Sequence, residues 1–210
     1  IINCAAFTNV DKCETEEKAA FQVNAIGAQN LSVAAYHIGA KMIQISTDYV
    51  FDGYEAKPKR EYDPINPLSI YGKSKAWGER LVRETNPRHF ILRTAWLYGE
   101  GHNFVRTMLR LGLEKGEVSV VHDQIGSPTS TKDLAKCIIS LMQTESYGTY
   151  HATCEGSCSW YEFAQKIFDI RGLKVRVNPI STEKLNRSAK RPKYSVLENF
   201  MLELIGLNSL

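Results

Sequence analysis

Short apolar runs alternate with longer stretches of helical periodicity along the chain. The runs of strand length cover residues 1–6, 41–45, 89–94, 118–122, 149–151 and 174–177. Most of them are continuously apolar, which is typical of strands that are covered on both faces. Strands that alternate with helices in this way indicate βαβ units around a mostly parallel sheet.

The helical stretches carry apolar residues at intervals of three and four. They predict helices over residues 15–38, 71–84, 103–114, 132–143 and 159–171, with Ser157 or Ser159 as the N-cap of the last one. One apolar stripe of the first helix is expected to face the sheet, and it consists of Ala19, Ala20, Val23, Ile26, Leu31, Ala34 and Ala35.

Residues 52–67 are rich in proline, glycine and charge, which predicts an exposed loop between a strand end and a helix. Loops of this kind lie beside the active site in open α/β sheets. The fold class is therefore α/β, with a doubly wound, mostly parallel, Rossmann-like sheet. Residues after about 122 are expected to form a smaller C-terminal α/β region.

The chain opens on Ile1-Ile2-Asn3-Cys4-Ala5-Ala6, which resembles the interior of a buried strand and contains no Met. We therefore expect the N-terminal strands and the glycine-rich turn of such a sheet to precede residue 1. No Gly-x-x-Gly-x-x-Gly turn, which places a pyrophosphate at a helix N-terminus, occurs in the 210 residues. On its own, this chain is expected to bind a dinucleotide poorly.

Composition and charge exclude several classes of protein. With 43% hydrophobic side chains, the 210 residues can bury a core. The 26 basic and 23 acidic residues are interspersed, so no basic stripe for a nucleic acid is present. No run of about 18 apolar residues predicts a membrane span. Five cysteines at no framework spacing favour reduced thiols and a cytoplasmic protein.

The sharpest chemical signal is Tyr71-Gly72-Lys73-Ser74-Lys75. Tyr71 and Lys75 stand four residues apart, so on a helix they share one face. A phenol has an ordinary pKa near about 10, and a nearby ammonium lowers this pKa because it favours the phenolate. A reductase needs an acid that protonates a carbonyl oxygen as hydride arrives, and such a Tyr meets that need. The bare pattern also occurs on solvated helix faces.

Two further signals follow apolar strands. Thr47 and Asp48 come after residues 41–45, at the carboxyl end of a strand, where doubly wound sheets bind their ligands. These two residues also fit a turn that merely ends the strand. Trp96 follows residues 89–94 and is expected at the same edge, where an indole can pack against a sugar ring or enter the core. Asn24 is predicted to fasten its helix to the neighbouring strand by side-chain hydrogen bonds, and Asp11 is predicted to fasten a loop in the same way.

In this order, Thr47, Tyr71 and Lys75 resemble the catalytic set of short-chain dehydrogenase/reductases. Longer segments are similar to successive motifs of one extended branch, the dTDP-4-dehydrorhamnose reductase family: residues 3–11, 45–53, 93–99, 124–129, 159–164 and 191–195. These segments span nearly the whole chain. The resemblance implies that NADPH or NADH reduces the C4 keto group of dTDP-4-dehydro-L-rhamnose to dTDP-L-rhamnose, in dTDP-rhamnose and polysaccharide biosynthesis.

The resemblance also implies roles for single residues. Tyr71 would be the proton donor, and Lys75 would hold the nicotinamide ribose and tune Tyr71. Thr47 would help to match the pKa of acid and substrate. Thr47, Asp48 and Trp96 would contact the dTDP-sugar.

At the end of the first strand, Ala5, Ala6 and Phe7 would lie along the cofactor, although the family more often has Tyr at the position of Phe7. Residues 1–122 would form the remainder of the NAD(P)-binding Rossmann domain, interleaved with a mainly substrate-binding region over residues 123–210. The residue that distinguishes NADPH from NADH would precede residue 1.

Family members form homodimers in some cases, sometimes with Mg²⁺ between subunits, and no residue of this chain is assigned as its ligand. His151, Cys154 and Cys158 offer only three ligands at no zinc spacing, so no metal site is predicted. Two alternatives stay open. One is another nucleotide-sugar reductase or epimerase of the extended family. The other is a non-catalytic regulatory relative, against which the intact Thr47, Tyr71 and Lys75 argue.

Overall fold

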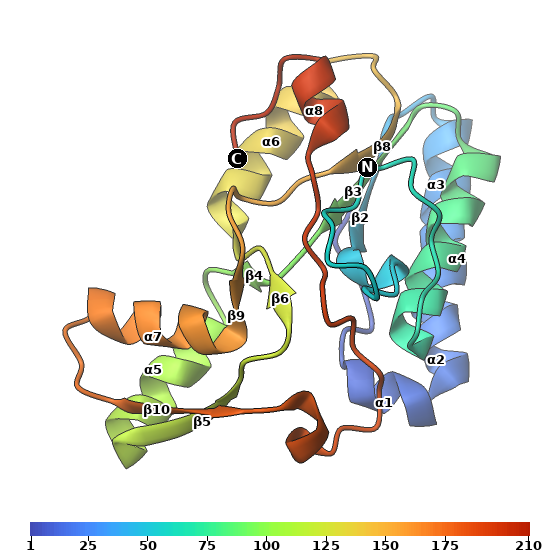
Figure 1. Cartoon of the computed structure of the whole chain (residues 1–210). Helices are drawn as coiled ribbons and strands as arrows, with labels where there is room; N and C mark the ends of the chain where they lie inside the picture. The colour runs from blue at the N-terminus through green and yellow to red at the C-terminus, as the bar shows by residue number, and fades with distance from the viewer.

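Four parallel strands form the central sheet of the computed structural model, which describes residues 1–210 (Figure 1). Their order is β1 (Ile2–Asn3), β2 (Met42–Thr47), β3 (His89–Thr94) and β8 (Gly148–His151). Strands β2 and β3 pair in register from Met42 opposite His89 to Thr47 opposite Thr94. Because parallel strands end at one edge, these two threonines lie side by side there.

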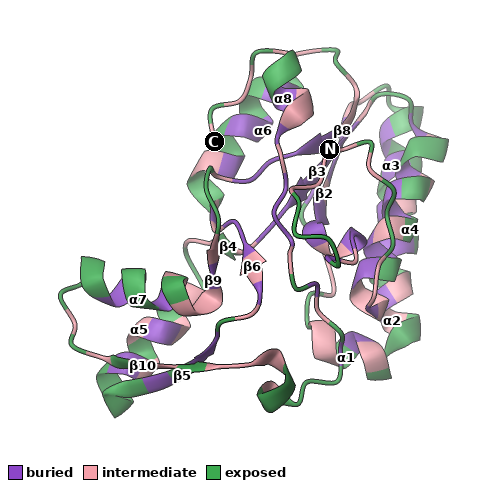
Figure 2. Ribbon diagram, viewed as in Figure 1, coloured by how far each residue is buried: buried purple, intermediate pink, exposed green.

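Helices cover both faces of this sheet, which confirms the doubly wound α/β class. On one side lie α3 (Ala28–His37) and α4 (Ile70–Thr85), and on the other α6 (Thr131–Met142) and α8 (Phe200–Leu204) (Figure 1). Each side has its own apolar core, visible as buried residues between sheet and helices in Figure 2. The first core includes Ala28, Ala35, Met42, Val82 and Ile91, and the second includes Ile43, Phe90, Leu92, Leu134, Leu141, Tyr150 and Leu202.

A smaller lobe is built around a second parallel pair, β5 (Glu117–Val121) and β10 (Arg176–Ile180). Helices α5 (Phe104–Lys115) and α7 (Trp160–Ile170) pack on this pair around Met108 and Phe168. Of the two predicted N-cap residues, Ser159 is the N-cap of α7, and it forms a capping box with Glu162. The lobe and the central sheet are interleaved in sequence, because β5 precedes β8 along the chain.

Two short strand pairs connect the lobe to the central sheet. These pairs are β4 (Leu97–Tyr98) with β7 (Thr129–Ser130), and β6 (Ile125–Gly126) with β9 (Cys158–Ser159). After β10, the short helix η3 (Thr182–Leu185) leads into an extended segment that runs back past α1 towards α8 (Figure 1). Residues from both parts of the chain therefore meet between the lobe and the sheet.

The first predicted helix differs from the structure in extent and in facing. It consists of α1 (Val10–Thr15), α2 (Glu17–Phe21), a π-helical segment η1 (Gln22–Gly27) and α3. The wider π turn shifts the phase of the helix, so the expected stripe is wrong at four positions, which are exposed: Val23, Ile26, Leu31 and Ala34. Ala35 is buried as predicted, and four small residues outside the expected stripe also face inward, namely Asn24, Ala25, Ala28 and Ser32.

Two other local predictions need correction. The first strand ends at Asn3 rather than residue 6, because the Asn3 side chain accepts a hydrogen bond from the Ala5 N–H and turns the chain out of the sheet. The loop over residues 52–67 packs against the C-terminal segment, with Lys59 paired to Leu197, and contributes no residue to the cavity described below.

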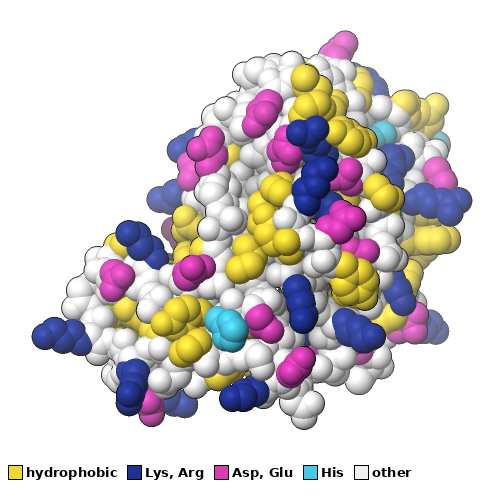
Figure 3. Space-filling model, in the orientation of Figure 1, with side chains coloured by type: hydrophobic (Ala, Val, Ile, Leu, Met, Phe, Trp, Pro, Cys, Tyr) yellow, Lys and Arg dark blue, Asp and Glu magenta, His cyan; other side chains and the backbone are white.

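The surface in Figure 3 carries basic and acidic side chains interspersed, as the sequence predicts. No helix combines the length and the apolar character that crossing a bilayer requires.

Candidate active site

A cavity of about 340 Å³ opens at the carboxyl ends of β1, β2 and β3. It brings together six of the eight predicted site residues, which are Ala6, Thr47, Asp48, Tyr71, Lys75 and Trp96. Ala5 and Phe7 do not line it. Ten further residues line the cavity that were assigned no role from the sequence, although all of them lie within the segments that resemble the family: Cys4, Thr8, Val10, Ile45, Ser46, Tyr49, Thr94, Ala95, Leu97 and Trp160.

Helix α4 delivers Tyr71 and Lys75 to the cavity from one face, one turn apart, as their spacing predicts. Ser69 begins this helix by accepting a hydrogen bond from the Gly72 N–H at 3.1 Å. Gly72 is required here because a Cβ would lie 2.2 Å from the carbonyl oxygen of Tyr49. The close approach puts the start of α4 directly against the end of β2.

The electrostatics of this pair differ from the sequence expectation. Desolvation raises the pKa of Tyr71 to about 12, against a smaller lowering effect of a hydrogen bond with Thr47, and Lys75 is not among the causes. Burial lowers the pKa of Lys75 to about 8, and the negative charge of Glu79 partly opposes this. The Lys75 ammonium donates a 2.6 Å hydrogen bond to the Ile45 carbonyl. Tyr71 is therefore a neutral phenol at neutral pH, which suits a proton donor.

Thr47 and Asp48 form the polar edge of β2 beside Tyr71. The Thr47 hydroxyl donates to Asp48 Oδ1 at 2.9 Å and accepts from the Tyr49 N–H at 3.2 Å. Asp48 Oδ2 is buried without a hydrogen-bond partner. Burial raises the pKa of Asp48 to about 6, although the hydroxyls of Ser195 and Thr47 work against it. The turn predicted as the alternative role of these residues is present as well.

Trp96 lies at the predicted edge but with both ring faces covered. Its indole stacks on Trp160 with ring centroids 3.5 Å apart, and a Cβ on Gly126 would lie 2.5–2.7 Å from three of its ring atoms. A ring stacked at 3.5 Å leaves no room for another atom between, so Gly126 lies on the opposite face. Trp96 has φ of 49°, a strained conformation that is concentrated at functional sites. It therefore offers the cavity its ring edge.

Residues after β1 are fixed by a buried asparagine. Asn24, in the π-helical segment, accepts from the Phe7 N–H at 2.8 Å and donates to the Phe7 carbonyl at 3.2 Å and to Ser74 at 2.9 Å. This confirms the fastening role predicted for Asn24 and extends it to α4. Gly78 makes the contact possible, since a Cβ there would lie 2.2 Å from the Asn24 carbonyl oxygen.

Behind the cavity lies an ionic network that the sequence did not indicate. Glu79 follows Lys75 by one turn of α4 and is fully buried. Arg93 donates to both of its carboxylate oxygens, at 2.9 and 2.8 Å, and Ser46 donates at 2.6 Å. The Arg93 charge and these hydrogen bonds hold the pKa of Glu79 below its usual value against the effect of burial. His151 lies 3.4 Å from Arg93, and burial lowers its pKa to about 3.

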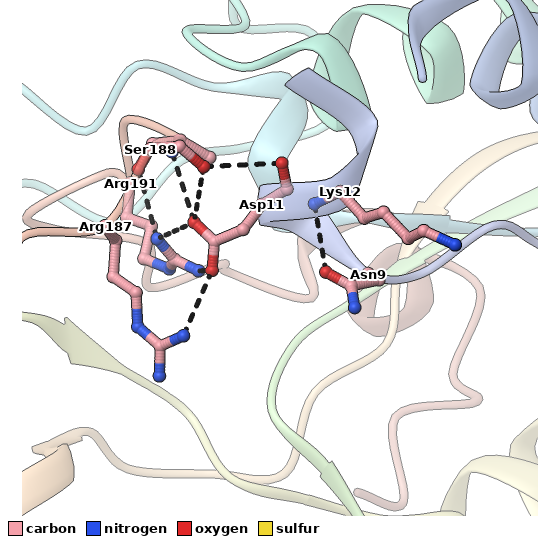
Figure 4. Close-up of polar contacts among 7 residues, drawn as sticks. Asn9, Asp11, Lys12, Arg187, Ser188 and Arg191 are labelled. Atoms are coloured by element: carbon pink, nitrogen blue, oxygen red, sulfur yellow. Dashed lines mark hydrogen bonds and ion pairs between the residues drawn. The ribbon is translucent and has the colours of Figure 1, made fainter. Parts of the chain in front are cut away.

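Asp11 fastens the C-terminal segment to α1, as predicted (Figure 4). Its carboxylate accepts hydrogen bonds from Arg191 at 2.8 and 3.2 Å, from Ser188 at 3.3 Å and from the Ala189 N–H at 3.2 Å, and Arg187 lies 3.4 Å away. The Arg191 hydrogen bond is the main reason that the pKa of Asp11 falls to about 2. We call these residues the Asp11 clasp.

A parallel sheet with helices on both faces and with Thr47, Tyr71 and Lys75 around one cavity defines an α/β protein of the short-chain dehydrogenase/reductase class. A family model described as the RmlD substrate binding domain matches residues 1–210. The chain belongs to this family. No group of three or more His, Cys, Asp or Glu side chains in it is arranged to hold a metal ion.

Individual relatives agree with the family match. The spore coat polysaccharide biosynthesis protein SpsK of Bacillus subtilis (strain 168) is 48% identical over 208 residues, which cover 99% of this chain and 73% of that protein. A dTDP-4-dehydrorhamnose reductase of Aggregatibacter actinomycetemcomitans is 45% identical, covering 94% and 72%. The crystal structure of dTDP-4-dehydrorhamnose reductase from Bacillus anthracis str. Ames in complex with NADP superposes with a TM-score of 0.97 at 52% identity, covering 98% and 74%.

Proposed function

We propose that this protein is an NADPH-dependent oxidoreductase that reduces the C4 keto group of dTDP-4-dehydro-L-rhamnose to dTDP-L-rhamnose. The observation that carries the chemistry is the cavity in which Thr47, Tyr71 and Lys75 meet at the carboxyl edge of a parallel sheet. The observation that carries the substrate is the 45% identity to a dTDP-4-dehydrorhamnose reductase.

Tyr71 is the proton donor of the proposed reaction. As hydride reaches the carbonyl carbon, the oxygen becomes an alkoxide, which is a stronger base than a phenolate, so the proton moves from the phenol to the sugar oxygen. A pKa of about 12 keeps this proton on Tyr71 until that moment. We assign to Lys75, one turn away on α4, the stabilisation of the phenolate that remains, and to Thr47, which lines the same cavity, the positioning of the phenol.

The residues around the end of β1 fit a nicotinamide cofactor. Cys4, Ala6 and Thr8 have short side chains and line the cavity together with Lys75. We assign Ala5, Ala6 and Phe7 to the path of the cofactor and Lys75 to its ribose. The cofactor supplies the hydride. The NADP complex of the Bacillus anthracis reductase supports NADPH over NADH.

Asp48, Thr47 and Trp96 are the proposed contacts for the dTDP-sugar. Five free cysteines support the cytoplasmic location that this reaction and NADPH imply. A homodimer, and Mg²⁺ between its subunits, stay predictions from the family resemblance.

The test follows NADPH absorbance at fixed dTDP-4-dehydrorhamnose, with the protein at the full length of its relatives, and compares wild type with Tyr71→Phe. Tyr49→Phe is the matched control, because Tyr49 packs edge-on against Tyr71 at 5.6 Å yet is assigned no proton transfer. Removing the general acid should lower kcat by about 10²–10⁴-fold in Tyr71→Phe.

Three outcomes separate the candidate functions. Turnover that is lost in Tyr71→Phe and largely kept in Tyr49→Phe supports the reductase. No turnover by a folded wild type that binds NADPH favours a different nucleotide-sugar, which a product analysis across several nucleotide-sugars would identify. No turnover of any of them favours the regulatory relative.

A further inference from the structure

Thr94 ends β3 with a buried hydroxyl that has no partner in the protein. The residue is 4% exposed, and its Oγ1 makes no hydrogen bond. Burying an unpaired hydroxyl costs free energy, and for that reason buried polar groups are nearly always paired. A valine would fill the same space without this cost. The unpaired hydroxyl therefore points to a function.

The position of Thr94 shows what the hydroxyl faces. It lines the same cavity as Tyr71 and Lys75, and it is the register partner of Thr47 on the neighbouring strand. Asp48, next to Thr47, has a second buried oxygen without a partner, Oδ2. Two of the three unpaired buried side-chain oxygens of the molecule thus lie on residues that line this one cavity.

We propose that the Thr94 hydroxyl is a substrate-binding group that hydrogen-bonds a sugar hydroxyl, while the free Asp48 oxygen accepts from another hydroxyl of the same ring. This inference rests on the proposed function. A saturated sugar ring carries hydroxyl groups that both donate and accept, which suits one neutral hydroxyl and one carboxylate oxygen in the cavity wall.

Sheet order favours the sugar over the cofactor as the partner of Thr94. The cofactor path proposed above runs along the end of β1, whereas Thr94 stands on β3, beyond β2 in the sheet. Thr94 also leads directly into Ala95 and Trp96, which line the cavity on the side proposed for the sugar. The carboxamide of a nicotinamide offers similar hydrogen-bonding chemistry, so the experiment must separate the two ligands.

The experiment uses Thr94→Val, which removes the hydroxyl and keeps the shape, and Thr94→Ser, which restores it. In the enzyme at the full length of its relatives, KM for dTDP-4-dehydrorhamnose should rise about tenfold in Thr94→Val, as expected for one lost hydrogen bond, and stay near wild type in Thr94→Ser. The Kd of dTDP-L-rhamnose, measured by calorimetry, should rise by a similar factor. The midpoint of urea unfolding should stay unchanged or increase in Thr94→Val.

Thr153→Val is the matched control. Thr153 is equally buried, but its hydroxyl is paired with Leu197 and Asn199 outside the cavity. This variant should lower the unfolding midpoint and leave KM and Kd unchanged. The two valine variants thus predict opposite patterns, loss of binding without loss of stability for Thr94 and the reverse for Thr153.

Several results would overturn the proposal. If KM and Kd are unchanged in Thr94→Val, Thr94 does not contact the sugar. A rise confined to the KM of NADPH would show the same. A lower unfolding midpoint would mean that the hydroxyl stabilises the fold. Failure of the proposed function is distinct, because it shows as absence of turnover in the wild type. In that case calorimetry with other dTDP- and UDP-sugars decides whether Thr94→Val weakens sugar binding.

Discussion

At the carboxyl ends of β2 and β3, the two faces of the sheet differ in how completely their buried polar side chains are hydrogen-bonded. On the face of α4, Ser46 and Arg93 saturate the carboxylate of Glu79 with three hydrogen bonds of 2.6–2.9 Å. On the other face, one residue further along each strand, Thr47 and Thr94 open into the cavity, and Thr94 has no partner. All four residues are buried to a similar degree. Thr47 is itself paired with Asp48 and Tyr49. The unpaired Thr94 hydroxyl, rather than the degree of burial, therefore distinguishes the binding side from the structural side.

Alternation along β2 and β3 causes this difference. Successive side chains of a strand point to opposite faces, so on β3 a single step moves from Arg93 in the ionic network to Thr94 in the cavity. On β2, Ser46 belongs to the network and also lines the cavity. Glu79 connects the two sides, because it stands one turn after Lys75 on α4 and its negative charge favours the charged ammonium. The network holds the helix that presents Tyr71, and the cavity wall remains open for a ligand.

The largest expected effect on stability comes from breaking the buried ion pair between Arg93 and Glu79. Arg93→Met leaves the Glu79 carboxylate charged, fully buried and without its main partner, so the free energy of unfolding should fall by about 3–5 kcal/mol. Urea unfolding at pH 7 measures this loss. The double variant Arg93→Met with Glu79→Gln removes both charges and should recover part of it. A loss below about 1 kcal/mol in the single variant would show that the network contributes little, as an exposed pair does.

A smaller change in stability, of opposite sign, is expected when Asp48 in the cavity wall is replaced. Its pKa in the folded protein, about 6, lies above the ordinary value of 3.8, so folding favours the neutral carboxyl. This stability is complete below pH 3.8 and is lost as pH rises through about 6. Asp48→Asn removes the dependence, so relative to wild type the variant should gain up to about 3 kcal/mol between pH 4 and pH 7.

Urea unfolding of wild type and Asp48→Asn at several pH values between 4 and 7 provides the comparison. Parallel stability curves would contradict a neutral buried carboxyl. In the same variant, weaker binding of dTDP-L-rhamnose is expected, because a neutral amide replaces the unpaired oxygen that we assign to the sugar. Gain of stability together with loss of binding would indicate that Asp48 serves ligand binding rather than the stability of the fold.

The smallest effect is expected at the Asp11 clasp, which is paired but only partly buried. Its pKa of about 2 lies below the ordinary 3.8, so its stabilisation is present above pH 3.8 and is lost as pH falls through about 2. Asp11→Asn should lower the free energy of unfolding at pH 7 by about 2 kcal/mol.

The control for the clasp is Asp133→Asn, which breaks the exposed Lys136 pair and should cost much less stability than Asp11→Asn. Chemical unfolding at pH 7 compares the two variants. Equal losses for Asp11→Asn and Asp133→Asn would mean that the clasp acts as an ordinary surface pair.

Much of the fold was predictable because its signals are local. The strand over residues 89–94 has the predicted limits, and helices α4 to α7 begin and end within about one residue of the predicted ranges. The π-helical segment was not predictable, because its wider turn is stabilised by Asn24 bonding to Phe7 and Ser74, which are 17 and 50 residues away. The prediction from local periodicity therefore placed Val23, Ile26 and Leu31 on the buried face of the helix, whereas they are exposed.

The candidate site divides in the same way. The spacing of Tyr71 and Lys75, and the strand that precedes Thr47, fix which chemical groups meet at one edge, since helix pitch and parallel strand ends need no long-range information. The direction of the Tyr71 pKa shift was wrong in the sequence interpretation. It depends on how far the phenol is removed from water, and only the packing of Tyr49 and α4 around it determines that.

The sequence by itself determined the α/β class, most element limits and the Thr47, Tyr71 and Lys75 set, because each depends on residues within one or two turns or strands. Only the tertiary structure decided that Trp160 covers Trp96, that Arg93 neutralises Glu79 and that the Thr94 hydroxyl has no partner. These facts depend on side chains brought together from distant parts of the chain, and hydrogen-bond satisfaction is a property of the packed molecule rather than of any segment.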